Sequence, residues 1–168
     1  MLAIYFITGL LFAGMIFIVR DRRVCLAINL VFVIVQATLA VYAFSARGNT
    51  ELNYFTFDSL SVIFLMVMAI LSAAVFYHSI AYVREDDDWK RKLFFFSFIM
   101  LNLSLTGVYT ANNIIVSRIF IELTTLSAAG LISHNRPMSS LEATWKYVFI
   151  CSVGIALAYI GILFASAA

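Results

Sequence analysis

Long apolar runs separated by short polar segments fill most of this sequence. They cover residues 2–19, 24–44, about 58–83, 93–110, 114–133 and about 143–166. Each run is close to the roughly 20 mostly apolar residues that a helix needs to cross a bilayer. A chain in lipid must also satisfy its own backbone polar groups, which favours helices. The pattern therefore predicts an all-α, polytopic membrane bundle of six transmembrane helices, with residues 1–168 forming a single membrane domain.

The composition supports a membrane protein and excludes several other classes. Apolar and aromatic residues make up 64% of the 168 positions and charged residues 12%, against about 45–50% and about 25% in soluble domains. Six helices use roughly 120 residues, which leaves no room for a soluble catalytic domain. The net charge of +2, without a basic cluster, gives no support for nucleic-acid binding.

No motif in the sequence indicates catalysis by this chain. The phosphate-binding, dinucleotide-binding, zinc-protease and nucleophile-elbow patterns are all missing from the sequence. Cys25 and Cys151 lie inside apolar runs and lack metal-ligand or redox spacing, so they are expected to be small buried residues. We therefore expect no catalytic residue, no cofactor and no metal site.

The distribution of Lys and Arg between the loops predicts the orientation of the helices. If the N-terminus is outside, the inner loops hold eight of these residues and the outer loops hold Arg47 alone. The eight are Arg20, Arg22, Arg23, Arg84, Lys90, Arg91, Lys92 and Arg136. Because Lys and Arg are retained on the cytoplasmic side, the bias predicts an N-terminus outside the membrane. The positive charges also follow the first run rather than precede it, so that run is expected to be a retained helix and not a cleaved signal peptide.

Arg118 and Glu122 are the two charged residues placed deep in an apolar run. Glu122 is eight residues into the fifth run, which is roughly 12 Å at 1.5 Å per residue and hence near the bilayer midplane. An ionisable side chain there is unfavourable by about 2.5–3.5 kcal/mol on insertion scales. Arg118 is one helical turn away, on the same face and within ion-pair reach. Two interpretations stay open: a structural ion pair, or a protonatable Glu122 in an ion path whose charged form Arg118 favours.

Other polar residues near the ends of the runs give weaker signals. Asp58 and Asn113 each precede a predicted helix and are expected to cap its first turn. His78 lies near the inner end of the third run and is expected to join an interfacial aromatic belt. Glu142 and Lys146 have the i, i+4 spacing of a helical ion pair, although Lys146 could also reach inward toward a buried acid.

Several segments together resemble a known family of membrane subunits. They are FDSLSVIF (57–64), YHSIAYV (77–83), LTGVYTANN (105–113), FIELTTL (120–126) and SLEATWKYVFICSVGIALA (140–158). In this order they resemble the antiporter-like proton-channel subunits of respiratory complex I, Mrp cation/proton antiporters and membrane-bound hydrogenases. ELTTL followed by LEATWKY is most similar to the hydrogenase-4 and formate hydrogenlyase branch.

The resemblance implies roles for particular residues. It places the family's key glutamate on Glu122, a frequently retained lysine on Lys146, the acid before the third helix on Asp58 and the asparagine before the fifth on Asn113. It implies a non-catalytic membrane subunit of an oxidoreductase complex, in a prokaryotic cytoplasmic membrane, that contributes to a proton or sodium path. Redox chemistry would then occur on peripheral subunits.

Two departures from the family bear on this expectation. The family's subunits have about fourteen helices, including a broken seventh helix whose lysine interacts with the glutamate, and this chain ends before that helix. We therefore expect a fragment or one half of a split subunit, with another chain or segment supplying the missing helices. Arg118 stands where the family usually has an apolar residue, and it could replace the missing lysine or lock Glu122 in its charged form. A non-pumping assembly subunit and an Mrp-type sodium/proton antiporter subunit remain alternatives.

Overall fold

The computed structural model describes residues 1–19, 21–48, 50–51, 54–83, 87–133 and 138–167, and it contains six long helices. They are α1 (Leu2–Ile18), α2 (Arg22–Ser45), α3 (Ser59–Tyr82), α4 (Asp88–Thr110), α5 (Ile114–Ile132) and α6 (Met138–Ala167). Every predicted apolar run is a helix, so the all-α membrane bundle is confirmed. The N-terminus-outside orientation and the single-domain organisation stay predictions.

The helices have the length and composition of membrane spans. Five of them, α2 to α6, contain apolar stretches with a mean hydropathy of 1.6 to 2.5. The remaining helix, α1, has 17 residues and is the shortest, which places it at the lower limit of about 17–25 residues for a span. This chain is therefore a multi-pass membrane protein by the length and composition of its helices.

A small β-hairpin connects α2 to α3, which the apolar pattern did not predict. Strands β1 (Thr50–Glu51) and β2 (Phe55–Thr56) pair antiparallel. Gly48 precedes them at φ 80°, a conformation that favours glycine, and its N–H donates to the Phe57 carbonyl at 2.9 Å. Strands of two residues are too short for alternation to reveal them. The hairpin also touches the turn after α4, because Phe55 bridges to Ala111.

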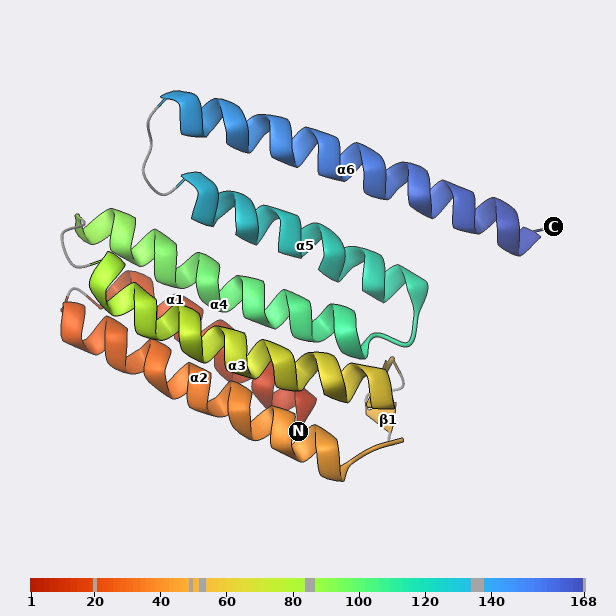
Figure 1. The fold of residues 1–168 in the computed structure, drawn as a ribbon, viewed down its shortest axis with the longest axis horizontal. Helices are drawn as coiled ribbons and strands as arrows, with labels where there is room; N and C mark the ends of the chain where they lie inside the picture. The colour runs from red at the N-terminus through yellow and green to blue at the C-terminus, as the bar shows by residue number, and fades with distance from the viewer. Residues whose placement is uncertain (20, 49, 52–53, 84–86, 134–137, 168) are drawn as a thin grey trace.

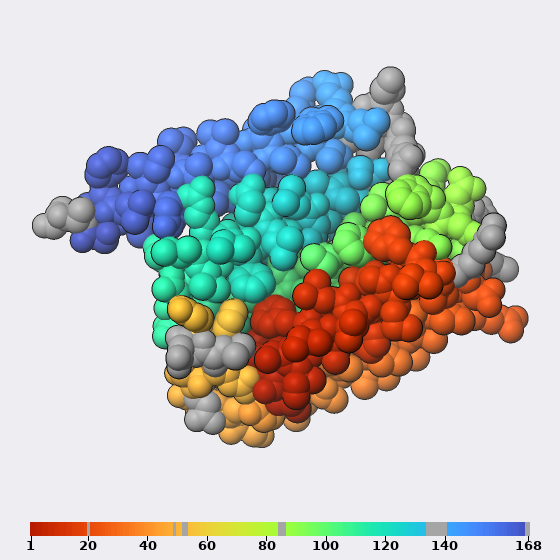
Figure 2. Space-filling view, turned by 180° about the vertical axis from the view of Figure 1, so that it is seen from behind, coloured from red at the N-terminus to blue at the C-terminus, as the bar shows by residue number. Residues whose placement is uncertain are grey.

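The helices are arranged as a body of four and an edge of two (Figure 1). Helices α1 to α4 pack together, with α1 against α2 and α4, and α2 against α3. Helix α5 lies along α4, and α6 lies along α5 at the edge of the molecule. Among the described residues, no helix other than α5 makes more than marginal contact with α6. The space-filling view shows the same outermost position of α6 (Figure 2).

Two apolar clusters fill the body. One joins α1, α2 and α4 around Phe32, Phe95 and Ile99, all at most 1% exposed. The other lies next to the hairpin and includes Leu2, Phe57 and Leu65. In lipid, helices associate through such close packing rather than through exclusion from water, so these clusters stabilise the body.

Buried polar side chains in the body bond to one another. The Tyr5 hydroxyl donates to the Gln36 Oε1, and the Thr106 hydroxyl donates to Tyr5 at 3.4 Å. Thr106 also donates to the Asn102 carbonyl at 2.9 Å, one turn back in its own helix. Hydrogen-bonded polar groups of this kind link helices within a bilayer. The body thus satisfies most of its buried polar atoms from within.

Candidate functional site

Helix α5 carries the candidate site, and its first turn explains where it begins. Asn113 has extended backbone angles and its Oδ1 accepts the Ile115 N–H at 2.8 Å. This bond satisfies one of the N–H groups that an N-terminus leaves free, so the predicted cap is confirmed. Starting α5 at Ile114 puts Glu122 at the middle of a 19-residue helix.

Glu122 meets a hydroxyl from the neighbouring helix α6. The Ser152 Oγ donates to the Glu122 Oε1 at 2.6 Å, and Ser152 is in the middle of its 30-residue helix. The structure therefore places the carboxylate at mid-helix depth, between α5 and α6, with one donor from this chain.

Arg118 has a different partner from the one expected. Its guanidinium carbon lies 4.4 Å from the centre of the Tyr159 ring on α6, in a cation–π contact. Within the described chain, no ion pair joins Arg118 to Glu122, so this conformation does not show the ion pair that was one of the two open interpretations. The physical reason is that α6 offers a partner to each residue: an aromatic face to Arg118 and a hydroxyl to Glu122.

These four side chains line an open groove between α5 and α6. Its volume is about 650 Å³, and Ile115, Ile119, Leu123 and Leu126 complete the lining. The residues on its walls are thus apolar except for Arg118, Glu122, Ser152 and the Tyr159 hydroxyl. The groove can admit water, an ion or a side chain from outside this chain to the carboxylate.

Lys146 lies away from Glu122 in this structure. Its Nζ donates to the Glu142 Oε1 at 2.5 Å, and both side chains are more than two-thirds exposed. The predicted i, i+4 pair is therefore confirmed. Lys146 precedes Ser152 by six residues in α6, which is about 9 Å along a helix axis, so the inward reach of Lys146 is not used here.

Asp58 and His78 lie at opposite ends of α3. Asp58 is at the N-cap position, but its exposed side chain makes no cap hydrogen bond. The predicted capping by this carboxylate is therefore wrong, because an exposed carboxylate is already solvated without the helix N–H groups. His78 is exposed and lies beside Tyr82, with ring centres 6.2 Å apart. That position fits the predicted interfacial belt.

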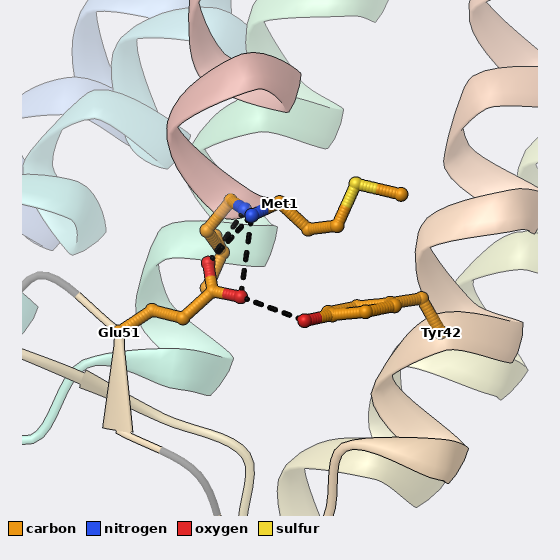
Figure 3. Close-up of polar contacts among 4 residues, drawn as sticks. Met1, Tyr42 and Glu51 are labelled. Carbon is orange, nitrogen blue, oxygen red and sulfur yellow. Dashed lines mark hydrogen bonds and ion pairs between the residues drawn. The ribbon is translucent and has the colours of Figure 1, made fainter.

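A second carboxylate, Glu51, has more partners than any of the predicted residues, and sequence analysis missed it. Figure 3 shows the Met1 amino group and the Tyr42 hydroxyl directed at its two oxygens. The Met1 nitrogen donates at 3.0 and 3.2 Å, the Leu2 N–H at 2.8 Å and Tyr42 at 3.2 Å. The available signal was weak, since Glu51 is one acid in a polar loop.

The partners of Glu51 decide its protonation. Partial burial alone would raise the pKa of this carboxyl. The Leu2 N–H, the Met1 ammonium and the Tyr42 hydroxyl outweigh burial and hold the pKa of Glu51 below its ordinary value. This cluster ties the hairpin to the beginning of α1 and the end of α2, and none of its residues lines the groove of Glu122.

The described residues contain no group of three or more His, Cys, Asp or Glu that could hold a metal ion. Of the two cysteines, Cys25 is buried as expected, whereas Cys151 is partly exposed because α6 has a neighbour on one side only.

Comparisons with known proteins agree with the resemblance drawn from the motifs. Residues 51–95 match the family model for the N-terminus of chain 5 of NADH-ubiquinone oxidoreductase, complex I. The antiporter subunit mnhA2 of Staphylococcus epidermidis is 30% identical over 102 residues, which are 60% of this chain and 13% of that protein. The hydrogenase-4 component F homolog of Methylacidiphilum infernorum is 26% identical over 115 residues, 65% of this chain and 24% of that protein.

A solved structure shows the same fold. One chain of the membrane-bound sulfane sulfur reductase, an archaeal respiratory membrane complex, superposes with a TM-score of 0.81 and 19% identity, over 95% of this chain and 36% of that chain. The chain spans less than a quarter of the length of the Staphylococcus epidermidis and Methylacidiphilum infernorum relatives. The resemblance to complex I-like antiporter subunits is confirmed by the family model and by both relatives.

Proposed function

We propose that this chain is the six-helix part of an antiporter-like subunit that conducts protons or sodium ions within a complex I-related membrane assembly. Its relatives carry the names of an antiporter subunit and a hydrogenase-4 component. A respiratory or hydrogenase complex in a prokaryotic cytoplasmic membrane is the setting that these names support. The chain itself would do no redox chemistry.

The carboxylate of Glu122 in the open α5–α6 groove is the observation that carries the proposal. An ionisable group at the middle of a membrane helix is retained against its insertion penalty when it serves an ion path or pairs with another charge. Here no charge of the described chain pairs with it, and its bond from Ser152 is a single neutral donor at 2.6 Å. A carboxylate so placed can exchange a proton through the groove.

Arg118 would keep a fixed positive charge beside this carboxylate, one turn away. Its cation–π contact with Tyr159 holds the guanidinium in the same groove without pairing it with Glu122. In this proposal the two charges stay unpaired, so each remains available to an ion that enters the groove.

The test is Glu122→Gln in the assembled complex, with coupled proton or sodium movement measured in vesicles. Glutamine preserves the volume and can still accept from Ser152, but it cannot release a proton. We expect assembly at the wild-type level and a loss of coupled translocation of at least about 100-fold, the scale on which removing one proton-transfer group acts. Glu142→Gln is the matched control, because it removes an exposed carboxylate of the next helix. Undiminished translocation by an assembled Glu122→Gln complex would refute the proposal.

The Mrp-type alternative has a specific observation in its favour, since three of the matched relatives are staphylococcal antiporter subunits at 30% identity. Varying sodium at constant pH separates the two cases. Proton movement that requires sodium supports an antiporter, and movement that requires an electron donor supports a respiratory or hydrogenase complex. The non-pumping assembly alternative is separated by the Glu122→Gln test, because it expects translocation by the complex to be unaffected.

Partner subunits would cover the exposed apolar surface of α6 at the edge of this chain. No residue of the apolar stretch Leu141–Ser166 of α6 is buried. Other membrane subunits, or a chain or segment that supplies further helices, would cover this surface and close the groove beside Glu122. Co-purification of this chain with membrane subunits of a redox complex would support the assignment.

A further inference from the structure

The end of the bundle where α2 begins and α3 ends contains a second groove, far from Glu122 in the fold. Its volume is about 600 Å³, and Arg22, Tyr77, His78, Ile80 and Ala81 line it. Among the described residues, those that line it include one permanent cation and no carboxylate. Neither the proposed ion path nor the comparisons assign a role to it.

Arg22 is held at the wall of this groove by one hydrogen bond to the described part of the chain. Its Nη2 donates to the Ile80 carbonyl at 3.2 Å, one of the last carbonyls of α3, which lack partners within the helix. A guanidinium has five N–H donors, so most of them remain for a ligand. Within the described chain no carboxylate forms an ion pair with Arg22. The cation is therefore both positioned and unneutralised by these residues.

The walls of the groove suit the boundary between headgroups and acyl chains. The Tyr77 side chain is 80% exposed, and His78 and Ile80 are exposed beside it. Tyrosine collects at the headgroup level of membranes, where its ring is apolar and its hydroxyl is solvated. From this level α2 and α3 continue toward the bilayer centre with exposed aliphatic side chains, among them Leu30, Ile34, Ile70 and Leu71. An acyl chain can lie along these surfaces while its headgroup stays at Arg22.

We propose that this groove binds the phosphate of an anionic phospholipid, with Arg22 as the main contact. Basic pockets between transmembrane helices at the membrane surface attract anionic headgroups, and guanidinium matches phosphate with paired hydrogen bonds. A zwitterionic lipid would place its own cation near Arg22, and none of the described lining residues is a carboxylate that could receive it. The bound lipid would join the start of α2 to the end of α3, in addition to the bond from Arg22 to Ile80.

Fluorescence quenching in vesicles tests the site directly. Tyr77→Trp places a reporter in the groove, with Trp89→Phe and Trp145→Phe removing the two native tryptophans. The full chain is placed in phosphatidylcholine vesicles that contain phosphatidylglycerol or phosphatidylcholine with brominated acyl chains. We expect the anionic lipid to be preferred about fivefold, the ratio for one cation worth about 1 kcal/mol. Equal quenching by the two brominated lipids would overturn the proposal.

Two variants and one control decide whether Arg22 is responsible. Arg22→Gln should abolish the preference for the anionic lipid, and an unchanged preference in a folded Arg22→Gln protein would refute the role of Arg22.

If the Arg22→Gln variant loses its helical circular dichroism, Ala81→Glu decides instead, because it keeps Arg22 and adds a carboxylate to the exposed wall of the groove. We expect Ala81→Glu to abolish the preference, and retention would count against the site. Arg47→Gln, in the loop after α2 and beside Phe44, should leave the preference intact. None of these outcomes depends on ion translocation by Glu122.

Discussion

Helices α1 to α4 contain one group of polar side chains that lies inside the bundle and is linked by hydrogen bonds, whereas α5 and α6 contain a group that lines a groove open to the surroundings. The first group consists of Tyr5, Gln36 and Thr106, and each of these side chains is at most 2% exposed. Glu122 and Ser152 illustrate the second. The four-helix body is stabilised by its own packing, and the two-helix edge presents a charged group to whatever lies beside it. The first group therefore links helices of the body to one another, and the second stays accessible from outside this chain.

The largest expected effect separates the body from the edge by removing one aromatic ring from each. Phe32→Ala should lower the free energy of unfolding by about 3 kcal/mol, because a fully buried phenyl group leaves a cavity. Phe149→Ala on α6 removes a ring that is 63% exposed, and the change should stay within about 0.5 kcal/mol for the chain alone. Denaturant titration in mixed micelles measures both. Similar losses for the two variants would show that the body is not the more tightly packed region.

A pair of glycine variants sharpens the same comparison at the helix contacts. A Cβ at Gly107 would lie 2.3 Å from the Phe120 ring of α5, while one at Gly154 on α6 meets no atom of the described chain within 4 Å. Gly107→Val should therefore destabilise the α4–α5 contact by about 1–3 kcal/mol through overpacking. Gly154→Val is the control and should be nearly neutral in the isolated chain. The result is checked by thermal unfolding followed by circular dichroism, and a larger loss for Gly154→Val would contradict the arrangement.

Within the edge, Ser152 provides a smaller test of the groove. Ser152→Ala removes the donor to Glu122, and a hydrogen bond to a charged group is worth about 1.5–3 kcal/mol. Solvent or a partner can replace part of it in an open groove, so we expect coupled translocation to fall several-fold rather than to vanish. Ser152→Thr keeps the hydroxyl and should keep most of the rate. A Ser152→Thr variant as slow as Ser152→Ala would argue against the hydroxyl as the relevant group.

The smallest expected effect concerns Glu51, at the hairpin end of the body. Because its folded-state pKa is lowered, this carboxylate stabilises the fold above its ordinary pKa of 4.5, and the stabilisation is lost as the pH falls through the lower folded value. Glu51→Gln should reduce stability at neutral pH by about 1 kcal/mol and flatten the acid side of the profile. Asp58→Asn, at a carboxylate without a cap bond, is the control. Unfolding midpoints measured from neutral to acidic pH distinguish the two variants.

The sequence predicted the helices well and the contacts between them poorly. All six runs are helices, because apolar length is a local property that any segment of the chain carries by itself. Asn113 and the Glu142–Lys146 pair were also predictable, since their partners are two to four residues away in the chain. Asp58 had the same local signal as Asn113, and its side chain nevertheless faces outward.

The contacts that define the candidate site depend on how two helices are rotated against each other. Periodicity places Arg118 and Glu122 on one face of α5, but it does not say that α6 presents Tyr159 and Ser152 to them. The same holds for the glycines. Gly154, Ala158 and Gly161 form a small-residue face in the sequence, yet Gly154 and Gly161 face open space while Gly107 and Gly130 closely approach other helices.

The amino-acid sequence by itself thus determined that this is a six-helix membrane protein with one acid near the middle of its fifth helix, because hydropathy, length and charge act along the chain. The tertiary structure decided which residues meet. In the structure Arg118 contacts Tyr159, and the Glu122 carboxylate accepts a hydrogen bond from the Ser152 hydroxyl of α6. Glu51 bonds to the beginning of α1, and among the described residues α6 packs mainly against α5. These outcomes follow from helix packing between residues that are 30 or more positions apart, where side-chain shape across an interface, rather than local pattern, sets the partner.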